Sequence, residues 1–147
     1  MAKIDSVTIL LVEDNEGHAR LIEKNLRRAH LSNPLIKFED GQLALDYFFG
    51  DDGYVNMRSH PPILVLLDLN LPVVDGYRVM EKLKTDERTK AIPIIILTTT
   101  DDVYEINRCY EMGCNVYLTK PIEYDEFAEA VTRLGLMLSV VMLPDGE

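Results

Sequence analysis

The chain of 147 residues has no tryptophan and only two cysteines, Cys109 and Cys114. Their spacing matches no zinc-binding or thiol-redox motif, so we expect both to be simple buried or half-buried thiols. The sequence also lacks an uninterrupted apolar run long enough to cross a bilayer, and the short polar start Met1–Ser6 leaves no room for a signal peptide. These absences predict a protein of the reducing cytoplasm.

Positive charge is scarce as well. The chain carries 15 Lys and Arg against 25 Asp and Glu, a formal net charge of -10. This balance argues against binding to nucleic acid, because few side chains are available to neutralise phosphates. It argues equally against binding to an anionic membrane surface. At this length we expect one domain over residues 1–147, with no separate output domain after the last apolar segment.

Apolar runs alternate with helical patterns along the chain. We predict strands near Thr8–Val12, Leu35–Phe38, Ile63–Leu67, Ile94–Leu97 and Val116–Leu118. We predict helices near Glu16–Ala29, Gln42–Phe49, Tyr77–Thr85, Val103–Met112 and Tyr124–Val140. Such alternation is typical of a doubly wound α/β fold with a five-stranded parallel sheet, and we expect the strand order 2-1-3-4-5.

Two segments do not follow from this pattern. The polar connection Gly50–Pro62 is longer than most loops of a compact domain, and a tolerated surface insertion is favoured over a partner contact. The last helix has one apolar stripe for the sheet: Phe127, Val131, Leu134 and Leu138. It has further apolar residues on other sides: Leu136, Met137, Val140, Val141, Met142 and Leu143. Exposed apolar surface of this kind marks an interface, unless the C-terminal tail folds back on its own domain.

Polar residues end four of the five predicted strands. They are Glu13-Asp14 after the first strand, Asp68 after the third, Thr98 after the fourth and Lys120-Pro121 after the fifth. Parallel strands bring these ends to one edge of the sheet, and ligands bind there at the point where the strand order reverses. Three neighbouring carboxylates repel one another unless a cation lies among them. The pattern therefore predicts a Mg²⁺ site around a carboxylate that can be phosphorylated, although Asp14 alone is also compatible with a helix N-cap.

Over residues 7–140 the chain resembles the receiver domain of two-component response regulators, which has a flavodoxin-like fold. The resemblance depends on Glu13-Asp14, Asp68, Leu71-Pro72 with Asp75-Gly76, Thr98 and Lys120-Pro121, in this order and at strand ends. The long connection before the third strand, the run Leu97-Thr98-Thr99 and the C-terminal Leu143-Pro144 look most like the single-domain regulators that partner phytochrome histidine kinases.

The resemblance implies a role for each acidic residue. Asp68 would accept a phosphoryl group from a phosphohistidine of the kinase. Asp14, Asp68 and the backbone carbonyl of Asn70 would bind Mg²⁺, and Glu13 would hold a metal-bound water. Glu13 stands where an aspartate is commoner in the family, which lengthens the water bridge.

It also implies how the signal is made. Lys120 and Thr98 would stabilise the phosphoryl oxygens, and a cis bond before Pro121 would aim the lysine inward. Thr98 and Tyr117 would be the switch residues, changing the surface of helix four, strand five and helix five, through which a homodimer would form. The protein would be a phosphoacceptor with slow autodephosphorylation rather than an enzyme, and Thr99 could lengthen the phosphorylated lifetime by restricting access of water.

Other classes of protein fit less well. A phosphatase of the haloacid dehalogenase type carries a second acid two residues after its nucleophile, where this chain has Asn70. A nucleotide-binding flavodoxin-like module would need a phosphate-binding loop in place of Glu13-Asp14. A binding scaffold that is never phosphorylated would not need both Asp68 and Lys120. The histidines His18, His30 and His60 are scattered and form no ligand set, so the phosphoryl donor must be another protein. Neither the input signal nor the downstream target follows from the sequence.

Overall fold

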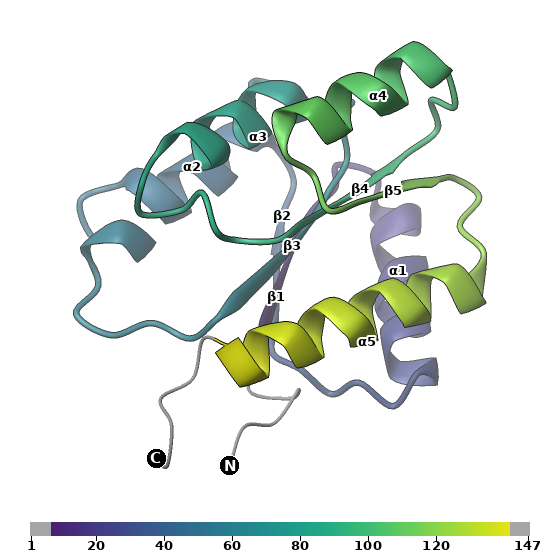
Figure 1. Cartoon of the computed structure of the whole chain (residues 1–147), viewed down its shortest axis with the longest axis horizontal. Coiled ribbons are helices and arrows are strands. Elements are labelled where there is room, and N and C mark those ends of the chain that lie inside the picture. The colour runs from purple at the N-terminus through teal and green to yellow at the C-terminus, as the bar shows by residue number, and fades with distance from the viewer. Residues whose placement is uncertain (1–6, 142–147) are drawn as a thin grey trace.

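The computed structural model describes residues 7–141, with side chains to residue 136, as a parallel sheet between two layers of helices (Figure 1). The strands are β1 (Thr8–Val12), β2 (Leu35–Phe38), β3 (Ile63–Leu67), β4 (Ile94–Thr98) and β5 (Val116–Thr119). They pair in the order β2-β1-β3-β4-β5, and every neighbouring pair is parallel. The predicted doubly wound sheet and its strand order are confirmed.

Helices cover both faces of the sheet. α1 (Glu16–Arg28) and α5 (Tyr124–Val141) lie on one face, and α2 (Gly41–Phe49), α3 (Gly76–Thr85) and α4 (Val103–Met112) lie on the other (Figure 1). All five helices agree with the predicted ranges to within one residue at each end. A short 3₁₀ helix, η2 (Tyr54–Asn56), was not predicted.

The central strands are buried on both faces, which explains their continuous apolar runs. Every residue of β1, β3 and β4 is buried. Alternate residues of β3 belong to different cores: Val65 and Leu67 pack with α2 and α3, whereas Leu64 and Leu66 pack with α1 and α5. A parallel sheet between two helical layers requires this pattern in its central strands, because neither of their faces meets water.

Four helices begin with a side chain that caps the first turn. Asn15, Asp40, Asp75 and Asp102 each accept a hydrogen bond from a backbone N–H in the first turn of α1, α2, α3 and α4. Such caps satisfy donors that the helix itself cannot pair. Because Asn15 caps α1, the interpretation of Asp14 as a plain N-cap is wrong, and the Asp14 carboxylate is available for another role.

The connection Gly50–Pro62 is fixed to the domain at one point. The Tyr54 ring is buried and lies edge-on to Phe48, with centroids 5.5 Å apart, and His60 packs on it at 3.9 Å. Residues 56–61 are exposed. The segment is therefore an anchored surface loop.

The apolar stripe of α5 is confirmed for Phe127, Val131 and Leu134, which are buried against the sheet. Leu136 is half exposed, at 49%. The remaining apolar residues of the predicted interface lie outside the described side chains: Met137, Leu138, Val140, Val141, Met142 and Leu143. Among residues 7–141, no helix is both long and apolar enough to cross a membrane.

Candidate functional site

The carboxyl edge of the sheet brings together the acidic residues predicted for it. Glu13 and Asp14 follow β1, and Asp68 follows β3, the neighbour of β1 in the sheet. One carboxylate oxygen from each of the three residues lies within 4.8 Å of the others. Glu13 and Asp68 are buried, whereas Asp14 is exposed. The site is therefore a buried acidic pair with a third acid at its rim.

Backbone contacts hold Asp68 in place. Its N–H donates to the carbonyl of Val12 at 3.0 Å, and its Oδ1 accepts from the N–H of Asn70 at 3.1 Å. Gly76, at the start of α3, passes so close that an added Cβ would lie 2.2 Å from the carbonyl oxygen of Asp68. This close approach is a physical reason for glycine at the second position of the Asp75-Gly76 pair.

Lys120 supplies the positive charge among the carboxylates. Its Nζ lies 2.5 Å from Glu13 Oε1 and 3.2 Å from Asp68 Oδ2. The Lys120 N–H donates to the carbonyl of Thr98 at 2.7 Å, and the Lys120–Pro121 peptide bond is cis. The last residue of β4 and the end of β5 thus together direct this ammonium over the acidic pair.

Burial also changes the proton affinity of the site. Loss of solvent raises the pKa of Glu13 above its usual value, the hydrogen bond from Lys120 and one from the Asn15 N–H lower it, and repulsion by Asp68 raises it further. The three carboxylates exceed the one ammonium in charge, so the cluster keeps a negative excess when all are ionised. Carboxylate and carbonyl oxygens are the ligands that Mg²⁺ takes in proteins. The donor set of this edge therefore fits a hard divalent cation.

Thr98 and Tyr117 belong to β4 and β5, on the other side of β3 from β1. Thr98 is fully buried, and its Oγ1 is 3.5 Å from Nδ2 of Asn70. Tyr117 is buried too, its hydroxyl donates to the carbonyl of Thr100 at 2.5 Å, and burial raises its pKa to about 12. The aromatic ring is thus already inside the domain, joined to the segment that follows Thr98, and its further movement on phosphorylation stays a prediction.

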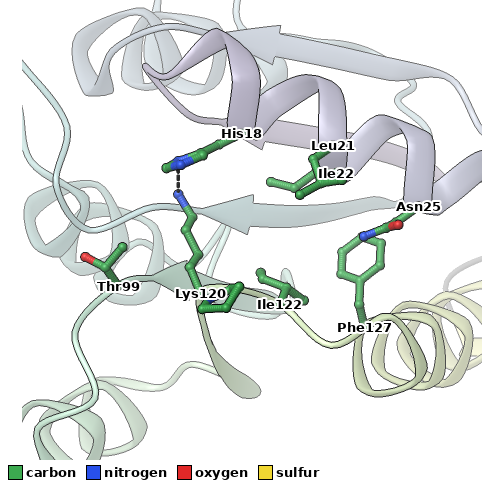
Figure 2. A pocket seen from close by; sticks show the side chains of 9 residues that line it. His18, Leu21, Ile22, Asn25, Thr99, Lys120, Ile122 and Phe127 are labelled. Carbon is green, nitrogen blue, oxygen red and sulfur yellow. Dashed lines mark hydrogen bonds between the residues drawn. The ribbon is translucent and has the colours of Figure 1, made fainter.

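His18 is part of the site, although the scattered histidines of the sequence predicted no ligand set. Its Nδ1 contacts Lys120 Nζ (Figure 2), at 3.0 Å. The same atom lies 3.9 Å from Glu13 Oε2. The sequence position of His18 could have indicated this placement. A helix that begins directly after Glu13-Asp14 must keep its first turn near the ends of the strands. Beside this contact lies a mainly apolar cavity of 320 Å³ between α1 and α5, lined in part by Leu21, Ile22 and Phe127.

Comparisons with known proteins agree with this geometry. The family model of the response regulator receiver domain matches residues 9–132. A solved response regulator receiver domain from Rhodospirillum rubrum is 50% identical, with a TM-score of 0.75, and the match covers 95% of this chain and 99% of that one.

Two further relatives match most of the chain. Response regulator Rcp1 of Synechocystis is 35% identical over 137 residues, which is 92% of each chain. The solved Mn²⁺-bound form of Rcp1 has a TM-score of 0.72 at 34% identity, covering 93% of this chain and 98% of that one. The solved phosphorylated cyanobacterial phytochrome response regulator RcpA has a TM-score of 0.71 at 31% identity, covering 93% and 96%. The fold, the acidic residues at the carboxyl edge of the sheet and these matches agree, and the chain belongs to the response regulator receiver domain family.

Proposed function

We propose that this protein accepts a phosphoryl group on Asp68 from a phosphohistidine of a histidine kinase, in a Mg²⁺-dependent reaction. The observation that carries the proposal is the position of the buried Asp68 carboxylate, 3.2 Å from Lys120 Nζ and within the acidic cluster of the sheet edge. The solved form of the relative RcpA is phosphorylated, and that of Rcp1 holds Mn²⁺.

The chemistry needs one nucleophile and a means of neutralising charge. A carboxylate oxygen of Asp68 attacks the phosphorus, the P–N bond to the imidazole of the kinase breaks, and its electron pair returns to the ring nitrogen, which gains a proton. The product is an acyl phosphate on Asp68. Lys120, whose Nζ is 3.2 Å from Asp68 Oδ2, donates to one phosphoryl oxygen. The hydroxyl of Thr98, which ends the neighbouring strand β4 and lies 3.5 Å from Nδ2 of Asn70, donates to another.

The acidic residues would bind the cation. Asp14, Asp68 and the carbonyl of Asn70 would hold Mg²⁺, with Glu13 reaching it through a water. When bound, the cation neutralises the phosphoryl oxygens that enter the acidic cluster. The protein acts here as a phosphoacceptor that loses its phosphoryl group slowly, rather than as an enzyme for a separate substrate.

The output is a change of surface. Phosphorylation adds about -1.5 to -2 charge at neutral pH. Thr98 then moves toward the new group, Tyr117 follows, and the surface of α4, β5 and α5 changes. That surface exposes Val103, Tyr104 and Tyr110 on α4 and Leu136 on α5, which supports a homodimer formed through it.

A phytochrome-type kinase is the proposed donor. The proposal is supported by similarity to RcpA, which is described as a phytochrome response regulator. The relative from Rhodospirillum rubrum is described only as a response regulator receiver domain. The proposal is tested by phosphotransfer rates from a phosphorylated phytochrome kinase and from unrelated kinases. Equal rates from all of them would remove the basis for this partner.

The first experiment is the intact mass after incubation with Mg²⁺ and acetyl phosphate. We expect a gain of one phosphoryl group that is lost with EDTA and in Asp68→Asn, and kept in Asp51→Asn, a change of an exposed loop acid. Release of the group by hydroxylamine would identify an acyl phosphate. If folded protein gains no phosphoryl group from either the small donor or a kinase, the protein is instead an interaction module that works without phosphorylation.

A further inference from the structure

His18, in the first turn of α1, contacts the lysine that the proposed reaction uses. Its Nδ1 lies 3.0 Å from Lys120 Nζ, and Figure 2 shows the ring directed at that ammonium across the end of the cavity. A lysine ammonium has three donors and no acceptor. In a hydrogen bond between these two atoms the ammonium is the donor, so Nδ1 is the acceptor.

The three groups that contact the Lys120 ammonium have different roles in the proposed reaction. Glu13 Oε1 lies at 2.5 Å and Asp68 Oδ2 at 3.2 Å from Nζ. Both oxygens belong to residues that are proposed to contact the cation or to carry the phosphoryl group. Their interactions with the Lys120 ammonium therefore change during the reaction. His18 takes no part in either step. It is the contact of Lys120 that can persist from the free to the phosphorylated state.

The surroundings offer little to replace it. Next to the His18–Lys120 contact is the mainly apolar cavity of 320 Å³, in which Asn25 and Thr99 are the lining polar side chains besides His18 and Lys120. No hydrogen bond joins either of them to Lys120 Nζ, whose side-chain partners among the described residues are Glu13, Asp68 and His18. A lysine side chain is long and flexible, and its position must be imposed by its contacts. Without the imidazole, the third donor of Nζ would turn to water, and the ammonium would spend less time over Asp68.

We propose that His18 is a positioning residue, which holds the Lys120 ammonium over the Asp68 carboxylate through its Nδ1 atom. This inference rests on the proposed phosphoacceptor function, because its effect on rate appears only if Asp68 is phosphorylated. Correct placement of a charged group before the reaction lowers the barrier without any covalent role for the group that places it.

The test compares two substitutions in the full chain. His18→Leu keeps bulk and removes the acceptor, whereas His18→Asn puts an amide oxygen close to the place of Nδ1. We expect the phosphorylation rate with acetyl phosphate and Mg²⁺ to fall about three- to tenfold in His18→Leu, the scale of one hydrogen bond, and to recover in His18→Asn. Circular dichroism of each variant checks that it is folded.

A second measurement follows the lysine itself. The NMR signal of the Lys120 side chain, assigned by its loss in Lys120→Met, should shift in His18→Leu and return toward its original position in His18→Asn. Loss of the aromatic ring alone also moves this signal, so the recovery in His18→Asn, which has an acceptor and no ring, is the result that reports the hydrogen bond.

The outcomes separate the two proposals. Equal rates for the unsubstituted protein and His18→Leu, or equal slowing in both variants without recovery of the Lys120 signal in His18→Asn, would overturn the role of His18. If the unsubstituted protein is never phosphorylated, the proposed function is wrong, and the NMR comparison alone then decides whether His18 holds Lys120.

Discussion

Glu13 and Lys120 are 107 positions apart in the chain, yet they form a buried ion pair in which the carboxylate is 1% exposed and the lysine side chain 9%. The pair joins the end of β1 to the end of β5 across the central strands. It lies beside Asp68, so the same ammonium balances two buried carboxylates. Removal of one charge from such a cluster leaves the others without compensation.

Lys120→Met should therefore destabilise the protein in the absence of divalent cation. We expect the free energy of unfolding at pH 7 with EDTA to fall by about 3–5 kcal/mol, since Glu13 and Asp68 lose their shared partner. Added Mg²⁺ should restore more stability to this variant than to the unsubstituted protein, because the lysine no longer competes for the carboxylates.

Urea unfolding with Mg²⁺ and with EDTA measures both effects. Lys90→Met is the control: Lys90 pairs with Glu87 at the surface, where an ion pair contributes little, and its loss should change stability by less than about 1 kcal/mol. A larger Mg²⁺ effect on the unsubstituted protein than on Lys120→Met would argue against competition at this site.

Tyr117 gives a prediction for alkaline pH. Its pKa is raised from 10.0 to about 12, chiefly because burial disfavours the phenolate. An acid whose pKa is higher in the folded state contributes stability that is fully present below the pKa of the unfolded chain and is lost as pH rises through the folded value. The window here runs from about pH 10 to pH 12.

Tyr117→Phe is the matched variant. At pH 7 it should lower stability by about 1 kcal/mol, because the hydrogen bond to the Thr100 carbonyl is lost. Above pH 10 the ranking should change, as the unsubstituted protein loses about 2 kcal/mol relative to the variant. Urea unfolding at a series of pH values measures the difference, and a constant difference up to pH 12 would contradict the prediction.

Val73 has a backbone conformation that is costly for its side chain. Its φ is 67°, in the left-handed region, and the residue is 78% exposed in the loop between β3 and α3. A β-branched residue is strained there, whereas asparagine adopts this conformation with less cost. Because the valine side chain makes little buried contact, Val73→Asn should raise the free energy of unfolding by about 1 kcal/mol.

Thermal or urea unfolding measures that gain. Val103→Asn is a comparison at another exposed valine, 69% exposed in the first turn of α4, where no such strain exists. It should leave stability within about 0.5 kcal/mol. A gain of equal size in both variants would mean that loss of exposed apolar surface, and not backbone strain, is the cause.

The sequence predicts the fold and the acidic edge well because both depend on local patterns. Polar residues such as Asp68 end apolar runs that are buried on both faces, and parallel strands leave only one place for those ends to meet. The expected direction of Lys120 comes instead from the resemblance to the receiver family, through the short motif Lys120-Pro121. These signals are short in range, so they can be read without knowing how the layers pack.

Other features depend on packing and were missed for that reason. His18 reaches Lys120 only because α1 starts at Glu16 with Asn15 as its cap, which a one-residue shift would change. The anchoring of the Gly50–Pro62 loop depends on Tyr54 finding Phe48, a contact within a polar segment that gives no periodic signal. The conformation of Val73 is likewise unexpected from a valine in the sequence.

Dimerisation through α4, β5 and α5 is the prediction that links the site to an output. Tyr104 is 73% exposed on α4, and such exposed aromatic residues are typical of interface centres. We expect phosphorylation to lower the dimer dissociation constant at least tenfold, and Tyr104→Glu to remove most of that gain by placing a charge in the interface.

Sedimentation analysis of both forms, with and without acetyl phosphate, measures these constants. Leu43→Glu is the control, since Leu43 is 46% exposed on α2 and lies outside the proposed surface. Equal dissociation constants for the phosphorylated and unmodified protein would contradict the coupling. An equal loss from Tyr104→Glu and Leu43→Glu would instead mean that added negative charge on a protein of net charge -10 opposes association wherever it is placed.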